Sequence, residues 1–190
     1  MAQSATLDLA RLQLGPVITS QKGAKSSAFT INGSVVYWAP GQYACPFEAK
    51  SFDGSDASRV SVCLRPDSDL QDQLMCLDHR VLTLAKENSV ALFGKELSDT
   101  TLEDKYQSCL KTSESHPPLL RCKINLTGAR PCKYWDPTGG SRADPPISWA
   151  NALVTPRICV KGLWLNSGQF GCVLEIHDAR VEEPDASCPF

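Results

Sequence analysis

Short runs of alternating apolar and polar residues recur along the chain and predict half-buried β-strands. Residues 27–38 hold two such runs on either side of Asn32-Gly33, the strongest short signal for a tight hairpin turn. A third run spans residues 58–64 and ends before Pro66. The first part of the chain therefore predicts a hairpin followed by a third strand.

After Pro66 the apolar residues recur every three or four positions, which is the period of a helix with one buried face. Asp67 and Ser68 are suitable caps for a helix that runs to about Asn88. The apolar stripe consists of Leu70, Leu74, Leu77, Val81 and Leu84.

A second helix is predicted shortly afterwards, because Thr100 and Glu103 have the spacing of a capping box. Its apolar face would consist of Leu102, Tyr106, Cys109 and Leu110. Together the two predicted helices form an insertion at about residues 67–112.

Strand patterns return after this insertion. Residues 119–126 alternate, with a basic outer row, and residues 131–137 predict a short edge strand. Residues 156–181 read as two long strands joined at residues 166–168, which gives a second hairpin. Strands, then helices, then strands again predict a mainly β (α+β) domain, with a barrel or a sandwich as the natural way to protect its edges.

The length of 190 residues favours a single domain. Residues 1–25 have weak periodicity and predict a weakly ordered arm or an irregular first strand. Residues 26–181 form the predicted domain, and residues 182–190 an acidic tail.

Composition indicates the compartment in which the protein acts and the ligands it is not expected to hold. No run approaches the roughly 18 apolar residues of a membrane span, and the N-terminal residues lack the pattern of a signal peptide. We therefore expect an intracellular protein in a reducing compartment, without membrane contact. An odd count of nine cysteines, spread evenly along the chain, favours free thiols that pack as small apolar residues. No Cys-x-x-Cys pair or histidine at ligand spacing predicts a metal, and no cofactor is expected.

Charge is unevenly distributed. Residues 66–117 carry five Lys and Arg against ten Asp and Glu, whereas residues 118–170 carry seven against two. The last twenty residues are acidic again, with Arg180 against five carboxylates. Such a pattern suits a cationic groove that an acidic tail can occupy when no other anion is bound.

No enzymatic constellation is present in the sequence. Neither a phosphate-binding glycine loop nor a nucleophile elbow occurs, and His177 beside Asp178 is interpreted as a solvated surface pair.

Basic and aromatic residues do coincide, which is the combination that binds single-stranded nucleic acid, because cations track phosphates and rings stack on bases. Among these rings, Tyr134 and Trp135 are expected to be more exposed than Trp164. The candidate nucleic-acid-binding residues are Tyr37, Trp38, Arg121, Lys123, Arg130, Lys133, Tyr134, Trp135, Arg142, Arg157, Lys161, Trp164 and Phe170.

Several segments together resemble a family encoded by nucleocytoplasmic large DNA viruses, which is similar in turn to phage single-stranded DNA-binding proteins. The match runs over about residues 22–182, and its most specific piece is the last hairpin, Gly162-Leu163-Trp164 followed by Phe170-Gly171. The resemblance implies a five-stranded oligonucleotide/oligosaccharide-binding (OB) barrel with a helical insertion after the third strand. The matching segments are residues 25–47, 77–98, 116–125 and 157–181.

The acidic tail adds to this resemblance, since single-stranded DNA-binding proteins of bacteria and phages end in an acidic segment with a terminal phenylalanine. A ring and a carboxylate at such a tip can dock on a partner protein. The candidate partner-docking residues are Glu182, Glu183, Asp185, Pro189 and Phe190.

The sequence thus predicts a non-enzymatic single-stranded DNA-binding protein for replication, recombination or repair, whose tail recruits replication or repair proteins. RNA binding and a homodimer stay open, and a viral chain would act in the host cytoplasm or nucleus, or in the virion. Two alternatives remain: a structural or adaptor protein, for example a virion component, that uses its barrel for protein contacts, and an enzyme with a reactive cysteine.

Overall fold

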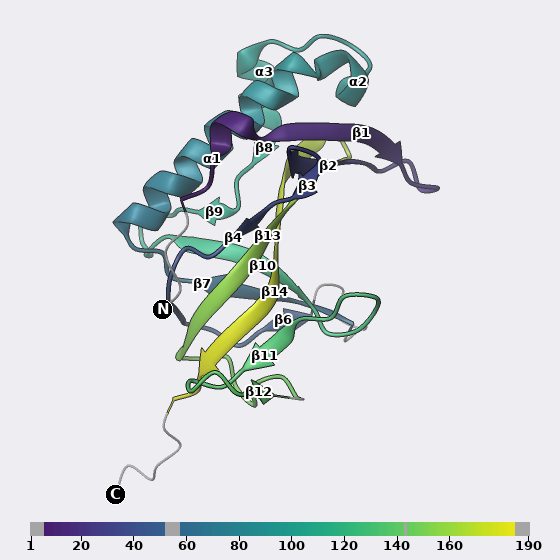
Figure 1. Cartoon of the computed structure of the whole chain (residues 1–190). Helices are drawn as coiled ribbons and strands as arrows, with labels where there is room; N and C mark the ends of the chain where they lie inside the picture. Colours follow the sequence, from purple (N-terminus) through teal and green to yellow (C-terminus); the bar gives the residue numbers. More distant parts are fainter. Residues whose placement is uncertain (1–5, 52–57, 143, 185–190) are drawn as a thin grey trace, which may run out of the picture.

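A long β-hairpin organises the molecule. In the computed structural model, which describes residues 6–51, 58–142 and 144–184, β13 (Ala152–Asn166) and β14 (Gln169–Glu182) pair along almost their whole length. Ser167 and Gly168 make the turn with φ values of 50° and 80°, as a type I′ turn requires. Figure 1 shows this hairpin running away from the helices, which are grouped at one end of the molecule.

The main sheet has the order β1-β2-β13-β14-β10-β7-β6. Its pairs are antiparallel except β10 with β14. The remaining members of this order are β1 (Gln13–Thr19), β2 (Lys25–Ile31), β6 (Lys50–Ser51), β7 (Arg59–Leu64) and β10 (Leu119–Asn125). Short strands attach to these: β3 (Ser34–Val35), β4 (Tyr37–Trp38), β5 (Tyr43–Cys45), β8 (Tyr106–Gln107), β9 (Leu110–Lys111), β11 (Lys133–Trp135) and β12 (Ser141–Arg142).

The predicted first hairpin is confirmed. Asn32 and Gly33 lie between β2 and β3 with φ values of 52° and 74°. Of the two alternatives for residues 1–25, the strand is the one observed at residues 13–19, since β1 pairs with β2 after the short 3-10 helix Leu9–Arg11. β1 therefore extends the sheet at its edge.

The helical insertion is partly as predicted. α1 (Ser68–Glu87) begins where the side chain of Asp67 accepts a hydrogen bond from the Leu70 amide, and its predicted apolar stripe is buried. An additional short helix, α2 (Ser89–Phe93), follows directly. The insertion thus holds three helices in the described residues, not two.

The start and end of α3 (Asp99–Lys105) differ from the prediction. Its cap is Ser98, whose hydroxyl accepts a hydrogen bond from the Thr101 amide, rather than Thr100. The helix ends before Tyr106, which begins β8, so only Leu102 of the predicted apolar face lies on a helix. A serine two residues earlier offers an equally good cap, and pairing of β8 with β14 ends the helix.

The predicted five-stranded closed barrel is not observed as such. The described strands are more numerous, because short strands such as β3, β4 and β5 attach to the main sheet, and the sheet does not close. The coarser prediction of a mainly β fold with a few helices is confirmed, and it is consistent with an OB-like fold.

One apolar core joins the inner face of the sheet to the helices. Trp38, Phe29 and Phe170 are among its largest fully buried side chains. All eight described cysteines are free thiols, and Cys76 on α1 is the exposed one among them, so the prediction of cysteines as core residues is confirmed for most. None of the described helices is both long and apolar enough to cross a bilayer.

Candidate nucleic-acid interface

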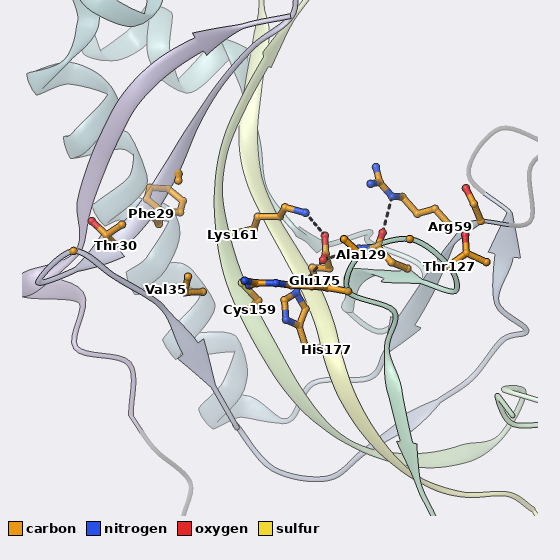
Figure 2. A pocket seen from close by; sticks show the side chains of 16 residues that line it. Phe29, Thr30, Val35, Arg59, Thr127, Ala129, Cys159, Lys161, Glu175 and His177 are labelled. Carbon is orange, nitrogen blue, oxygen red and sulfur yellow. Dashed lines mark hydrogen bonds and ion pairs between the residues drawn. The ribbon is translucent and has the colours of Figure 1, made fainter. Parts of the chain in front are cut away.

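Two clefts lie on the outer face of the sheet. The first, which we call the Glu175 cleft, has a volume of about 680 Å³ and lies between the β2–β3 hairpin and residues 127–130. Cys159 and Lys161 of β13 and Glu175 and His177 of β14 form its floor. Figure 2 shows the two walls, with Phe29, Thr30 and Val35 on one side and Arg59 and Thr127 on the other.

The second, the Trp164 cleft, has a volume of about 520 Å³. Trp164 lines it together with Val173 of β14 and residues 107–109, which follow α3. Four basic residues also line it: Lys25, Lys111, Arg121 and Lys123.

The two clefts follow one another along the same strands, because every second residue of a strand points to the same face. Val173 lines the Trp164 cleft, and Glu175, two residues on, lines the Glu175 cleft. On β10, Lys123 likewise lines the Trp164 cleft and Asn125 lines the Glu175 cleft. We call the two clefts together the groove.

A β-bulge brings Trp164 to this face. The register of β13 against β14 shifts between Val160 and Gly162, which inserts one extra residue into β13. Lys161 and Trp164 consequently both line the groove, although an unbroken strand would point them to opposite faces. A strict period of two, which groups Trp164 with the core residue Val160, fails at this position.

The groove is strongly cationic. Its lining contains seven Lys and Arg residues but a single carboxylate, Glu175, among the residues that the structure describes. Burial lowers the pKa of Lys123, and the neighbouring charges of Arg59, Arg121 and Lys161 lower it further. An ammonium whose pKa is depressed by other cations marks a place of positive potential that favours an anion.

Glu175 connects several side chains of the floor. Its carboxylate accepts hydrogen bonds from Lys161 Nζ at 2.6 Å, Asn125 Nδ2 at 2.7 Å and His177 Nε2 at 2.9 Å. Burial raises the pKa of Glu175, but the bonds from Lys161 and His177 outweigh burial and hold the pKa below its ordinary value. Arg59 Nε donates to Asn125 Oδ1 at 2.9 Å and extends this network to the wall.

Aromatic rings continue the floor beyond His177. The Tyr37 hydroxyl lies 3.2 Å from His177 Nδ1, and the two rings meet edge to face. The guanidinium of Arg157 lies over the Tyr37 ring at 4.3 Å and pairs with Asp178. His177 and Asp178 therefore have specific partners, and the interpretation of them as a solvated pair is wrong.

Seven of the thirteen candidate residues gather at the groove. Six are side chains that line it or stack beside it, and Tyr37 contacts its floor through His177. The seven are Tyr37, Arg121, Lys123, Arg130, Arg157, Lys161 and Trp164.

Three candidate rings are buried instead. Trp38 is 1% exposed, Tyr134 5% and Phe170 0%, so none offers a face to a ligand in this structure. The expectation that Tyr134 is more exposed than Trp164 is wrong. Tyr134 packs against Trp149, because the parallel pairing of β11 with β14 turns it toward the core.

The other three candidates lie toward the far end of β14. Lys133 is exposed, and Trp135 is half-buried with its indole donating to Asp178 Oδ1 at 3.3 Å. Arg142 pairs with Glu183 at 2.7 Å. These residues are not part of the groove lining.

The proposed tail begins on the body of the protein. Glu182 is the last residue of β14 and accepts a hydrogen bond from Gln42, while Glu183 accepts one from the Ile147 amide. These two residues are thus engaged within the domain, contrary to their prediction as part of a separate tail. Asp185, Pro189 and Phe190 lie outside the described residues.

Six groove residues that carry positive charge or belong to the Glu175 network were not predicted from sequence. The prediction selected cations and aromatic rings, so it passed over Glu175, His177 and the uncharged Asn125. The three remaining cations lie outside the basic segment at residues 118–170. The pairing of β7 with β10 and of β2 with β13, which adds their basic residues to this face, is visible only in the fold. The six are Lys25, Arg59, Lys111, Asn125, Glu175 and His177.

Two observations on the described residues bear on chemistry other than binding. No group of three or more His, Cys, Asp or Glu residues there is arranged to hold a metal. Burial raises the pKa of Cys45 to about 11 and that of Cys132 to about 12. Such thiols are protonated at neutral pH and are weak nucleophiles.

No protein-family model and no curated protein matches the sequence. Solved structures do match. The single-stranded DNA-binding protein gp2.5 of bacteriophage T7 is similar with a TM-score of 0.55 and 11% identity, over 81% of this chain and 96% of that one. A C-terminally truncated single-stranded DNA-binding protein of bacteriophage Enc34 is similar with a TM-score of 0.52 and 11% identity, over 93% and 98% of the two chains. At this identity the likeness shows a shared fold.

Proposed function

We propose that the protein binds single-stranded DNA, without catalysing a reaction, along the groove formed by the Glu175 and Trp164 clefts. The observation that carries the proposal is the concentration of seven Lys and Arg residues around two clefts that follow one another along the same strands. In a chain of net charge -2, such a concentration is not a consequence of overall composition.

The cations suit a phosphate backbone. Lys and Arg side chains along the groove can follow consecutive phosphates, and the counterions they release supply most of the sequence-independent affinity. Arg59 and Arg130 are exposed at the Glu175 cleft. Burial and neighbouring cations lower the pKa of Lys123, and an added anion there would raise it again.

The rings suit unpaired bases. Trp164 is half-buried in its cleft, and Tyr37 is 38% exposed with Arg157 stacked on it. Bases stack on aromatic rings and on the planar guanidinium of arginine with little regard to sequence. Two such platforms at the two clefts are enough to hold a short strand.

The structural neighbours support the same proposal. The T7 and Enc34 proteins that share this fold are both single-stranded DNA-binding proteins. Fold alone does not determine function, so the argument rests on the groove first and on these neighbours second.

A titration tests the proposal. Fluorescence of the protein's four tryptophans is followed while single-stranded DNA, duplex DNA or RNA is added at low and at high salt. We expect quenching by single-stranded DNA, with an affinity that falls as salt rises. No binding at low salt would refute the proposal. Preferential binding of RNA would show that RNA, and not single-stranded DNA, is the ligand.

A role in replication, recombination or repair, a relationship to the large-DNA-virus family, and recruitment of partner proteins by the tail are further parts of the proposal. They rest on the sequence resemblance and on the acidic composition of residues 182–190.

Because Glu182 and Glu183 bond to the body of the domain, deletion of residues 185–190 is the cleaner test of the tail. We expect the truncated chain to unfold at the same temperature and to bind single-stranded DNA more tightly. Weaker binding would exclude a tail that competes for the groove.

A further inference from the structure

Glu175 is unusual for its position. It is the only carboxylate among the described residues that line the groove, and its side chain is 3% exposed at the centre of the floor. Its negative charge is maintained there by three donors, Lys161, Asn125 and His177. A buried carboxylate is costly unless it is paired in this way.

The ion pair with Glu175 engages Lys161, the cation of the floor. Lys161 Nζ lies 2.6 Å from Glu175 Oε2, and its side chain is still 50% exposed. The ammonium charge at the floor is therefore balanced by a fixed carboxylate before any ligand arrives. Arg59 and Arg130, by contrast, are exposed where they line the cleft, and Arg59 donates to the uncharged amide of Asn125 rather than to a carboxylate of the floor.

This arrangement distinguishes the floor from the rim. A phosphate approaching the floor meets a Lys161 ammonium that Glu175 already balances, whereas a phosphate at the rim meets arginine. Bases, which carry no net charge, lose nothing by this balance and find the ring of Tyr37, which contacts the floor through His177. The groove thus favours a strand whose phosphates follow the rim and whose bases turn inward.

We infer that Glu175 is a specificity-determining residue that discriminates against duplex DNA. The inference rests on the proposed function and concerns the same groove. A duplex presents phosphates outward and keeps its bases paired, so it can only offer phosphate to a floor whose ammonium Glu175 already neutralises. Single-stranded DNA escapes this penalty by turning its bases inward. Selectivity by repulsion of the wrong ligand is a general device in recognition.

The test is the ratio of the affinities for oligo-dT and for a duplex of the same length, measured at one low salt concentration. Glu175→Gln keeps the shape and removes the charge, so we expect tighter binding of both ligands and a larger gain for the duplex. The ratio should fall by roughly three- to tenfold, the effect of a single charge at an interface. Glu175→Asp keeps the charge and should keep most of the selectivity. Glu103→Gln, an identical charge change on α3 away from the groove, is the matched control and should leave the ratio unchanged.

A second variant gives the opposite sign and replaces a side chain that is itself half-exposed. Lys161→Gln removes the half-exposed partner and leaves the Glu175 charge less compensated, so duplex affinity should fall more than oligo-dT affinity and the ratio should rise. In the double variant of Glu175 and Lys161, both to Gln, the gain in duplex binding should disappear, because the released ammonium is absent. Thermal unfolding of each variant separates these effects from loss of structure.

The outcomes separate the two proposals. If the unmodified protein binds oligo-dT but neither Glu175→Gln nor Lys161→Gln moves the ratio, Glu175 does not determine selectivity and the proposed function stands. A fall in oligo-dT affinity in Glu175→Gln at unchanged unfolding temperature also overturns the inference, since it makes Glu175 a support for the strand. If the unmodified protein fails to bind oligo-dT, the proposed function and this inference fall together.

Discussion

Individual side chains of the groove have separable tasks. Trp164 offers a ring, Lys123 a charge whose pKa is lowered by burial and by its neighbours, and Glu175 the opposing charge. Basic residues at Arg121 and Lys123 were predictable from sequence, because they alternate with core residues of one strand. Trp164 was harder to place, since the bulge that turns it outward leaves no mark in the apolar pattern.

Trp164→Ala tests the stacking role at one residue. Loss of one stacking platform costs about 1 to 3 kcal/mol of binding free energy, and each 1.4 kcal/mol is about a tenfold change in affinity. We expect weaker oligo-dT binding in that range by fluorescence anisotropy of a labelled oligonucleotide. Phe47→Ala removes a ring that is 51% exposed outside the groove, and it should bind as the unmodified protein does. Equal losses in both variants would contradict a specific role for Trp164.

Lys123 gives the groove a pH dependence of known sign. Burial and neighbouring cations lower the pKa of Lys123 in the unbound protein, and a bound phosphate raises the pKa again. Affinity is therefore highest below the lowered pKa and falls as pH rises through it, because binding must then take up a proton.

The measurement is oligo-dT affinity from neutral pH up to the ordinary lysine pKa of about 10.4. Lys123→Arg stays charged throughout this range and should show a flatter profile. An unchanged profile in Lys123→Arg would assign the pH dependence to another group.

Among the secondary-structure elements, β13 contributes to both clefts of the groove. It carries Cys159, Lys161 and Trp164, and it lies between β2 and β14 in the sheet. Gly162 makes this possible: a Cβ added there would come within 2.2 Å of the Ser27 carbonyl oxygen and 2.9 Å of Ala28 Cα. The close approach of the β2 backbone thus depends on the absence of a side chain at Gly162.

Gly162→Ala should therefore separate β2 from β13. Overpacking of this kind costs about 1 to 3 kcal/mol of unfolding free energy, which lowers Tm by roughly 2 to 4 °C per kcal/mol in a domain of this size. Gly15→Ala is the control, since a Cβ there would make an ordinary contact of 3.4 Å with the Ala28 carbonyl oxygen. Calorimetry that finds equal Tm values for the two variants would contradict this account of Gly162.

Elements defined by local signals were predictable from the sequence. The turns at Asn32-Gly33 and Ser167-Gly168, and α1 with its cap at Asp67, depend on neighbouring residues and appear as expected. Elements that depend on distant partners were not. The burial of Tyr134 follows from the pairing of β11 with β14, and the end of α3 from the pairing of β8 with β14. No period along the chain encodes these contacts.

At the scale of the whole molecule, charge is divided between faces. The acidic surplus of residues 66–117 lies largely on the helical insertion, whereas the cations of β2, β7, β10 and β13 converge on the groove. The sequence indicated the basic segment at residues 118–170 but not the contribution of Lys25 and Arg59, because strand order determines which basic residues meet. The long-range field of such a molecule orients an incoming strand toward one face.

The measurement that tests the central claim most directly is the salt dependence of oligo-dT binding for a groove variant and a control variant of equal charge. The groove variant replaces Arg59 and Arg130 by glutamine, and the control replaces Arg11 and Lys95, which lie on the helical side of the molecule. If the groove holds the strand, the plot of log affinity against log salt becomes shallower by about 1.4 in the groove variant, or about 0.7 for each phosphate that no longer meets a cation, and stays unchanged in the control. Equal slopes for the unmodified protein and both variants would contradict the placement of single-stranded DNA in this groove.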